Sequence, residues 1–286
     1  MRVLTLAFRD VAGSVLTPPP RSRQPVPPHS PWSDYLITDP WFYALAVPAL
    51  LITGISKGGF ASGGGNLSVP AMALLIPAPQ AAAIALPILC AMDIAGLRAW
   101  WGRWNRREMR VILPGGLFGI LIGAFAFGVM TDQAIKLMVG GIALAFLARS
   151  LWLGRHGASP APAAHSAARG GFWSAVSGFT STIAHAGGPP LAVYLYPLRM
   201  ERAQLAATTV VFFGTVNYVK LLPYALLGQL SLSNLLTSLV LLPLAPVGVR
   251  LGVWMQRRIS DRLFYRVIYV LLGATGLKLV ADGLGL

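Results

Sequence analysis

The chain has 286 residues, of which 55% are hydrophobic and 11% are charged, and its net charge is +14. Soluble domains typically carry about 25% charged residues, so this composition argues against a soluble enzyme and against a disordered protein. Of the 23 basic residues 19 are arginines, a bias that in a soluble protein would suggest nucleic-acid binding. Here the charges lie between long uncharged runs, so we expect a membrane protein whose partner is the lipid bilayer and not a nucleic acid.

We expect the first 40 residues to form a tail outside the membrane helices. Segment 17–31 (TPPPRSRQPVPPHSP) is rich in proline, a composition typical of disordered tethers. The apolar stretch 3–8 is short and gives little support to a cleaved signal peptide.

Four runs beyond the tail contain no Asp, Glu, Lys or Arg: 58–92, 111–131, 170–198 and 221–249. A hydrocarbon core of about 30 Å needs about 20 apolar residues per helix, so several runs can cross the bilayer and some can cross more than once. The sequence therefore predicts an all-α polytopic membrane protein. Its apolar segments, in chain order, are 41–56, 59–76, 81–101, 111–130, 134–153, 172–186, 189–198, 203–227, 232–255 and 263–280.

An internal repeat explains the order of these segments. A shift of 124 residues superposes Asp93 on Asn217, and after a five-residue insertion a shift of 129 superposes Asp132 on Asp261. Chance similarity between two Gly- and Leu-rich halves is the alternative, but collinear polar matches favour a true repeat. We expect a first transmembrane repeat over 41–153, a cytoplasmic linker over 154–169 and a second repeat over 170–286.

The arginines orient the two halves, because basic residues concentrate in cytoplasmic loops. The turns 130–133 and 228–231 carry no basic residue and are expected outside. Segment 81–101 then runs inward and its counterpart 203–227 runs outward, so the repeats are inverted and the C-terminus, and less securely the N-terminus, lie outside. Five spans per repeat, or three spans and a re-entrant hairpin, both satisfy this topology. The expected cytoplasmic loops are marked by Arg103, Arg106, Arg107 and Arg110, by Arg149, Arg155 and Arg169, and by Arg257, Arg258 and Arg262.

Two segments, one in each half, are broken by glycine or proline at 62–66 (SGGGN) and 186–190 (AGGPP). Paired breaks in inverted repeats indicate a transporter site at the bilayer midplane, where the first N–H groups of half-helices hold anions. Close helix packing is the alternative role for glycine. We prefer the ligand site for the two breaks and the packing role for Gly119, Gly123, Gly248 and Gly252.

Polar residues around the breaks are the candidate substrate ligands. Lys57 offers a counter-charge, although snorkelling to the cytoplasmic face is an equal alternative. His185 offers a hydrogen bond or a coupling proton, and a structural core histidine is equally compatible with the pattern. The full predicted substrate site is Ser56, Lys57, Ser62, Gly63, Gly64, Gly65, Asn66, Thr180, Ser181, His185, Gly187, Gly188 and Pro189.

The proton-coupling candidates are Asp93, Asn217, Lys220 and His185. A lone buried carboxylate is protonated or paired, so we expect Asp93 to bind a proton or a lysine such as Lys220, with an interhelical hydrogen bond as the structural alternative. Asp132 and Asp261 follow Thr131 and Ser260 at helix starts and are expected to be N-terminal caps.

No sequence motif for a catalytic or metal site is found. The single cysteine, Cys90, excludes an internal disulfide and a cysteine-cluster metal site. We therefore expect a non-enzyme without cofactors, driven by a gradient or a partner.

The stretch 54–70 (GISKGGFASGGGNLSVP), followed by Ala-Pro-Gln-Ala-Ala-Ala and echoed by Gly187-Gly-Pro-Pro-Leu191, resembles the sulfite exporter TauE/SafE family, also called the toluene-sulfonate uptake permease group. The resemblance covers about residues 42–283. It implies an inner-membrane carrier of sulfite, sulfonates or related organosulfur anions, often an exporter and coupled to the proton gradient. The Pro-rich tail departs from the family pattern.

These observations predict a secondary transporter of small sulfur-containing anions in the bacterial inner membrane, working by alternating access of two inverted halves around the two breaks. The residues themselves indicate only a small anion, and the sulfur comes from the resemblance. A passive anion channel, or a membrane scaffold or assembly factor without transport, are the alternatives. The exact substrate, the direction, the coupling ion and the oligomeric state stay open.

Overall fold

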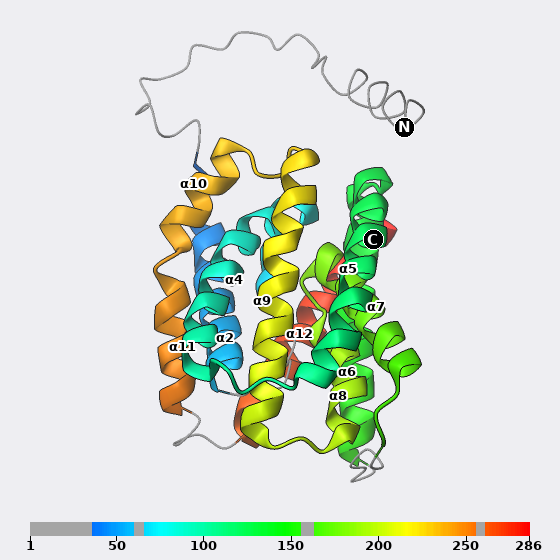
Figure 1. Cartoon of the computed structure of the whole chain (residues 1–286). Helices are drawn as coiled ribbons and strands as arrows, with labels where there is room; N and C mark the ends of the chain where they lie inside the picture. The colour runs from blue at the N-terminus through cyan, green and yellow to red at the C-terminus, as the bar shows by residue number, and fades with distance from the viewer. Residues whose placement is uncertain (1–35, 60–65, 156–162, 256–260) are drawn as a thin grey trace, which may run out of the picture. The chain divides into compact units, whose positions relative to one another are not determined.

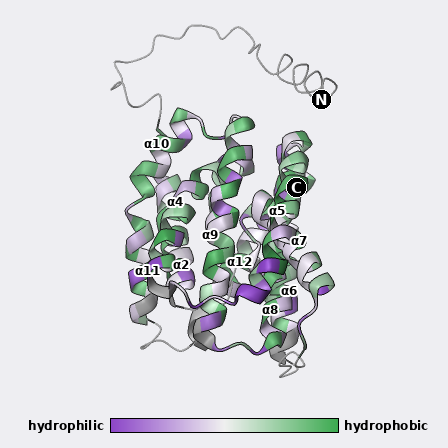
Figure 2. Cartoon of the chain, in the orientation of Figure 1, coloured by the Kyte–Doolittle hydropathy of each residue, from purple (hydrophilic) through white to green (hydrophobic). Residues whose placement is uncertain are grey.

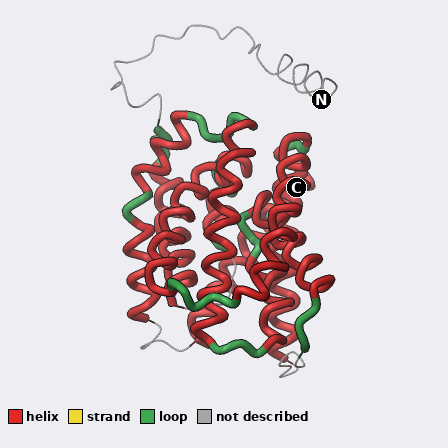
Figure 3. Tube along the Cα trace, in the orientation of Figure 1, coloured by secondary structure: helices red, strands yellow, loops and turns green. Residues whose placement is uncertain are grey.

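Helices make up all the regular structure in residues 36–59, 66–155, 163–255 and 261–286, the part of the chain that the computed structural model describes (Figure 3). This confirms the all-α class, while nearly all of the expected tail lies outside the described residues. The elements are α2 (Pro40–Gly59), α3 (Ser68–Met72), α4 (Ala78–Trp100), α5 (Arg106–Val129), α6 (Asp132–Arg155), α7 (Ala167–Ala184), α8 (Gly188–Leu195), the 3-10 turn η1 (Tyr196–Leu198), α9 (Arg202–Leu226), α10 (Leu232–Leu241), α11 (Leu244–Met255) and α12 (Asp261–Leu284).

Helices α2, α4, α5, α6 and α9 are each long and apolar enough to cross a membrane, and the bent pair α10–α11 adds a sixth candidate span. Their outward faces are apolar: Phe118, Leu121 and Phe125, at helical spacing on α5, are all exposed, Phe125 to 72%. A helix that exposes such a stripe needs lipid or another apolar surface around it. Figure 2 shows hydrophobic residues along the helices and hydrophilic residues in the connections at the lower end. The chain is a multi-pass membrane protein.

Segment 232–255, one apolar segment in the sequence, forms two helices, α10 and α11. The two helices meet at a break and are bent by 42°. Pro243 lies in the break; a proline inside a helix removes one hydrogen bond and its ring clashes with the carbonyl four residues earlier. Pro114, its counterpart in the first half, stays inside the continuous helix α5.

Two short helices, α3 and α8, each follow one of the two helix interruptions that the sequence predicts. Helix α3 has five residues and α8 has eight, so at 1.5 Å per residue they rise only about 8 and 12 Å. Between α7 and α8 the backbone turns left-handed at His185 (φ 50°), which confirms the second break. Most of the first glycine cluster, 60–65, lies outside the described residues.

Four helix pairs form most of the packing: α5 with α7, α2 with α11, α6 with α12, and α4 with α9. In Figure 1, α9 lies between α2, α4 and α11 on one side and α5 and α7 on the other. The α4–α5 and η1–α9 connections lie at the lower end of the view, and the α9–α10 turn lies at the upper end. Segments distant in sequence therefore meet along the whole length of the helices.

Glycines permit the closest of these approaches. A Cβ on Gly54 of α2 would lie 2.9 Å from the Cα of Gly248 on α11, and one on Gly123 of α5 would lie 2.8 Å from the Cβ of Thr182 on α7. A Cβ on Gly119 would collide with a backbone carbonyl of α7. The packing role expected for Gly119, Gly123 and Gly248 is confirmed, and that of Gly252 stays a prediction.

Asp132 corrects one expectation, because it is not the N-cap of its own helix. Thr131 takes that role, accepting a hydrogen bond from the backbone N of Ala134 at 3.2 Å. The Asp132 carboxylate instead accepts from the N of Ala78 at 2.9 Å and pairs with Lys136 at 2.9 Å. It caps the start of α4 from α6, a tertiary contact across 54 residues that spacing alone does not reveal. The side chain of Asp261 lies outside the described part.

Candidate functional site

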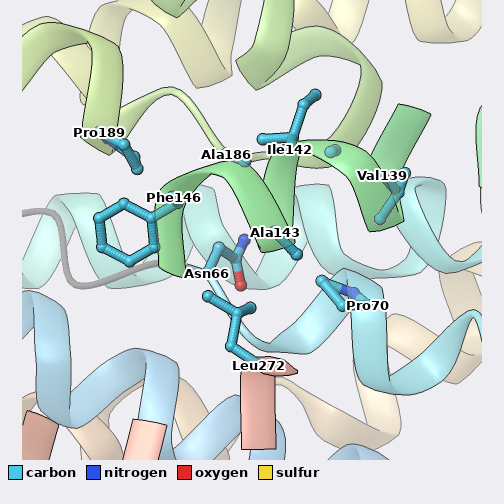
Figure 4. A pocket seen from close by; sticks show the side chains of 10 residues that line it. Asn66, Pro70, Val139, Ile142, Ala143, Phe146, Ala186, Pro189 and Leu272 are labelled. Atoms are coloured by element: carbon cyan, nitrogen blue, oxygen red, sulfur yellow. The ribbon is translucent and has the colours of Figure 1, made fainter. Parts of the chain in front are cut away.

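A small pocket lies between the two breaks (Figure 4). Its cavity volume is about 10 Å³, about the room that one water molecule needs. Five helices, α3, α6, α7, α8 and α12, and both break segments meet there, and apolar side chains predominate. The lining residues are Asn66 and Pro70 from the first break, Ala184, Ala186 and Pro189 from the second, Val139, Ile142, Ala143 and Phe146 from α6, and Leu272 from α12.

Asn66 is the polar side chain of this lining. Its Oδ1 accepts hydrogen bonds from the backbone N of Ser68 at 3.0 Å, from the Ser68 hydroxyl and from Thr53 Oγ1 at 3.1 Å. Because Oδ1 faces these donors, Nδ2 is turned away from them, and in Figure 4 it lies on the side of Ala143 and Ala186. Nδ2 is buried and has no hydrogen-bond partner among the described residues. A buried, unpaired donor is costly, so this N–H₂ group is available to an acceptor in the pocket.

The first break differs from the expected half-helix anion site. Helix α3 is a single turn, and the N–H of its first residue, Ser68, is already bound by Asn66 Oδ1. Pro70, its third residue, has no N–H to offer. The side-chain amide of Asn66 therefore takes the place of the backbone donors expected there.

The second break also offers fewer backbone donors than expected. Helix α8 begins Gly188-Pro189-Pro190 after the N-cap Gly187, and the two prolines carry no N–H. Leu191 N bonds back to Gly187 O at 3.3 Å. Of the first turn, only the N–H groups of Gly187 and Gly188 are left as possible ligand donors, and Pro189 contributes an apolar wall to the pocket.

Thr180 and Ser181 are buried near the second break but do not line the pocket. Thr180 Oγ1 donates to Val176 O at 2.9 Å and lies 3.2 Å from Ala186 O, so it ties the last turn of α7 to the break. Ser181 Oγ accepts from Lys220 at 3.0 Å. Their role as substrate ligands stays a prediction; in the structure the Thr180 hydroxyl contacts the break and the Ser181 hydroxyl contacts Lys220.

Asp93 is paired, but with a different lysine from the one expected. Its Oδ1 forms an ion pair with Lys57 Nζ of α2, and its Oδ2 accepts from Asn217 Nδ2 of α9 at 2.5 Å. The carboxylate is 2% exposed and the lysine 25% exposed. Lys57 therefore neither snorkels freely nor brings a net charge to the pocket, because Asp93 neutralises it.

Lys220 is fully buried and lies against His185. Its Nζ is 2.9 Å from Ser181 O, 3.0 Å from Ser181 Oγ and 2.7 Å from His185 Nδ1. The other ring nitrogen of His185, Nε2, lies 2.9 Å from Ala82 O of α4. The structure thus brings together two of the four proton-coupling candidates, His185 and Lys220, in one contact and the other two, Asp93 and Asn217, in another.

Of five further predicted ligands, the structure describes only one. Ser56 is buried in α2. Ser62, Gly63, Gly64 and Gly65 lie outside the described residues. Tyr224, which sequence reasoning missed, stacks on the His185 ring at 6.1 Å between centroids and donates to Thr182 O at 2.6 Å. A tyrosine inside an apolar segment gives no signal of such a contact.

The described residues contain no group of three His, Cys, Asp or Glu side chains that could hold a metal ion. The chemistry available at the pocket is hydrogen bonding by neutral N–H donors in apolar surroundings, with one buried lysine close by. Such a site can bind a small ligand without breaking or making covalent bonds.

An all-helical, multi-pass membrane protein with two broken segments meeting at a pocket is the class that these features define. The family model for "Sulfite exporter TauE/SafE" matches residues 46–279, and the chain belongs to this family. The resemblance found in the glycine-rich stretches is thereby confirmed. The family implies membrane transport of sulfite or sulfonate-type anions and not catalysis. Neither a curated protein nor a solved structure matches the chain.

Proposed function

We propose that the protein is a secondary carrier that exports small sulfur-containing anions, such as sulfite, sulfonates or related organosulfur compounds, across the bacterial inner membrane. The observation that carries the proposal is the unpaired Asn66 Nδ2 in the pocket between the two breaks. Family membership supports the substrate class. The pocket supports the place where it binds, and its volume of about 10 Å³ has to increase when a sulfite or sulfonate enters.

The pocket holds the anion through neutral donors. Asn66 Nδ2 donates to the oxyanion, and the N-terminus of α8, which begins with Gly188 and places Pro189 in the pocket wall, adds a partial positive charge. Apolar neighbours such as Phe146 and Leu272 exclude water, which strengthens each hydrogen bond. A site without a direct ion pair binds an anion weakly enough to release it, as a carrier requires.

Two inverted halves alternate around this pocket. The packing pattern supports this part of the proposal. Under the 124- or 129-residue shift α2 corresponds to α7 and α11 to α5, so the α2·α11 contact becomes the α7·α5 contact. The α4·α9 and α6·α12 pairs each join a helix to its own counterpart. The Asp93–Asn217 contact joins two residues that this exchange swaps. Proton transfer is coupled to the cycle, with the buried polar residues of α4, α7 and α9 as its path.

Uptake into proteoliposomes tests the function. Purified full-length protein is reconstituted, and the flux of ³⁵S-sulfite and of ethanesulfonate is measured with and without an imposed pH gradient. A carrier gives saturable flux that accumulates substrate when the gradient is present. Flux that rises linearly with concentration and ignores the gradient indicates a passive channel, and no flux of either anion contradicts the proposal.

Asn66→Asp tests the site within the same assay. The aspartate keeps the acceptor for Ser68 N but places a negative charge where the anion binds, and like charges a few ångströms apart in a partly dry site are expected to lower flux about a hundredfold. Gln133→Glu adds the same charge at the exposed α5–α6 turn and is the matched control. Equal flux in both variants would show that the anion does not bind beside Asn66.

A further inference from the structure

Lys220 and His185 form a buried basic pair, called here the Lys–His pair. Lys220 is 0% exposed and His185 is 7% exposed, on helices α9 and at the end of α7. An ammonium group has three N–H donors, and Lys220 Nζ has three acceptors within reach: Ser181 O, Ser181 Oγ and His185 Nδ1. None of these is a carboxylate, so the described hydrogen bonds of this lysine contain no counter-charge.

The proton positions on His185 follow from its partners. Nε2 faces Ala82 O at 2.9 Å, and because a carbonyl only accepts, Nε2 carries a hydrogen. Nδ1 lies 2.7 Å from Lys220 Nζ and 3.0 Å from Ser181 O. Because the closer neighbour is an ammonium that can only donate, Nδ1 presents its lone pair to Lys220 when the lysine is charged. The pair holds one extra proton with all its N–H groups bonded. A second proton would set an N–H of the ring against an N–H of the ammonium, so the pair carries charge +1 or 0.

Other titratable groups act on the pair from neighbouring helices, namely Asp93 and Cys90 on α4 and Lys57 on α2. Both carboxylate oxygens of Asp93 are engaged by Lys57 and Asn217. On α9 itself, the Tyr224 hydroxyl donates to Thr182 O. No group in the described part therefore neutralises the positive state of the Lys–His pair directly.

The pocket lies next to this uncompensated charge. Ala184 and Ala186, the residues on either side of His185, both line the pocket, while the His185 ring points to Lys220 and Ala82. His185 also holds the left-handed turn of the break, a conformation that glycine takes more readily. A histidine at such a position ties the shape of the break to the pair.

We infer that the Lys–His pair is the coupling-proton site and that an anion in the pocket is its counter-charge, so that one proton binds with each monoanion. This inference rests on the proposed function and adds the residues and the stoichiometry of coupling. The proton adds to a nitrogen lone pair, and no covalent bond to the anion forms. A proton and a monoanion that bind together cross the membrane without net charge.

Reciprocal linkage gives the size of the effect. Two opposite unit charges separated by about 10 Å, in surroundings of effective dielectric constant about 20, change each other's binding about tenfold. The anion is therefore expected to bind about tenfold more tightly when the pair is protonated, and binding is expected to take up a proton in the pH range where the free pair is neutral.

Isothermal titration calorimetry of ethanesulfonate into detergent-purified full-length protein measures this uptake. A sulfonate stays a monoanion at all working pH values, so every proton taken up belongs to the protein. Titrations at one pH in buffers of different ionisation enthalpy give the number of protons per anion, and a series from about pH 6 to 10 follows it. The wild type is expected to take up close to one proton at its maximum.

Three variants locate the proton. Lys220→Met is expected to bind ethanesulfonate about tenfold more weakly with no proton uptake. His185→Asn tolerates the left-handed turn, keeps an acceptor for Lys220 and cannot take a proton itself, so uptake is expected to persist with a shifted pH range. Lys278→Met removes an exposed lysine of α12 and is expected to behave as wild type.

The outcomes separate the two proposals. Binding by the wild type without proton uptake at any pH, or uptake that persists in a folded Lys220→Met, overturns the inference and leaves the carrier function standing. If Lys220→Met does not fold, His185→Asn decides the question. Proton uptake by this variant over the same pH range as the wild type then overturns the inference. Binding of neither ethanesulfonate nor sulfite by the wild type overturns the proposed function and this inference together.

Discussion

Asn217 donates a hydrogen bond to Asp93 at 2.5 Å, and the two residues stand 124 positions apart, the offset that superposes the two halves of the sequence. The contact joins α4 to α9, and Lys57 of α2 completes it by pairing with the other carboxylate oxygen. Three helices are thus tied by one buried carboxylate. If the halves are repeats, this contact lies at their axis and holds the inner faces together.

Removing Asp93 alone should lower the free energy of unfolding more than removing Asp93 and Lys57 together. Asp93→Leu leaves Lys57 without its counter-charge, and breaking a buried ion pair typically costs about 3–5 kcal/mol; the partial exposure of Lys57 lowers this to about 1–3 kcal/mol. The double variant Asp93→Leu/Lys57→Leu should recover part of that stability. Chemical unfolding in detergent, analysed as a double-mutant cycle, checks it, and a double variant less stable than the sum of the single ones would be contrary to this account.

Glycine contacts between helices should resist even a methyl group. Gly119→Ala sets a Cβ against a backbone carbonyl of α7, which cannot move away as a flexible side chain can, and overpacking of this kind costs about 1–3 kcal/mol. Gly141→Ala on α6 meets nothing within 4 Å and, as a glycine-to-alanine change inside a helix, should be neutral or stabilising by up to about 1 kcal/mol. Thermal unfolding of both variants in one detergent compares them, and equal midpoints would contradict the packing role.

Glu108 anchors the short helix α8 from the start of α5. Its carboxylate accepts from the Tyr194 hydroxyl at 2.6 Å and contacts His165 Nδ1 at 2.8 Å, and it is 4% exposed. Tyr194→Phe leaves a buried carboxylate oxygen short of a donor, at a cost of about 1–3 kcal/mol. Tyr218→Phe, at an exposed tyrosine of α9, is the control. Unfolding free energies that fall equally in both variants would show that the Glu108 contact has no special weight.

The inverted topology predicts which connections between helices can be labelled from outside the cell. In a Cys90→Ala background, cysteines at Arg103 and Glu201 should be protected from a membrane-impermeant maleimide added outside cells, whereas cysteines at Gln133 and Gln229 should react. All four positions lie in connections or at helix starts. Labelling of Arg103→Cys together with Gln133→Cys, in intact cells, would rule out the assigned topology.

Much of the fold could be predicted because it depends on local chemistry. Uncharged runs about 20 residues long mark membrane helices, and Gly-Gly-Pro-Pro at 187–190 marks a break after which a new helix, α8, begins. The Leu-Pro pair gives opposite results in the two halves, with Pro114 inside a helix and Pro243 in a break. The propensity of proline is the same at both places, so the surrounding packing decides, and that information is not local.

The candidate site could be predicted in its position but not in its bonding. Asn66 and Pro189 were both expected at the breaks, and both line the pocket. For Asp93, the interhelical hydrogen bond given as the structural alternative is present, to Asn217. The lysine partner is Lys57 and not the suggested Lys220, because Lys57 reaches Asp93 only through the packing of α2 on α4. The number of backbone donors expected at the breaks was also too high, since prolines in the first turn of a helix carry none of its free N–H groups.

Anomalous diffraction from crystals grown with selenite, the selenium counterpart of sulfite, tests the central claim most directly. A selenium peak within hydrogen-bond reach of Asn66 Nδ2, between Pro70 and Pro189, is the result predicted here. Selenium bound only at the cytoplasmic arginines, with the space beside Asn66 unoccupied at saturating selenite, would contradict it.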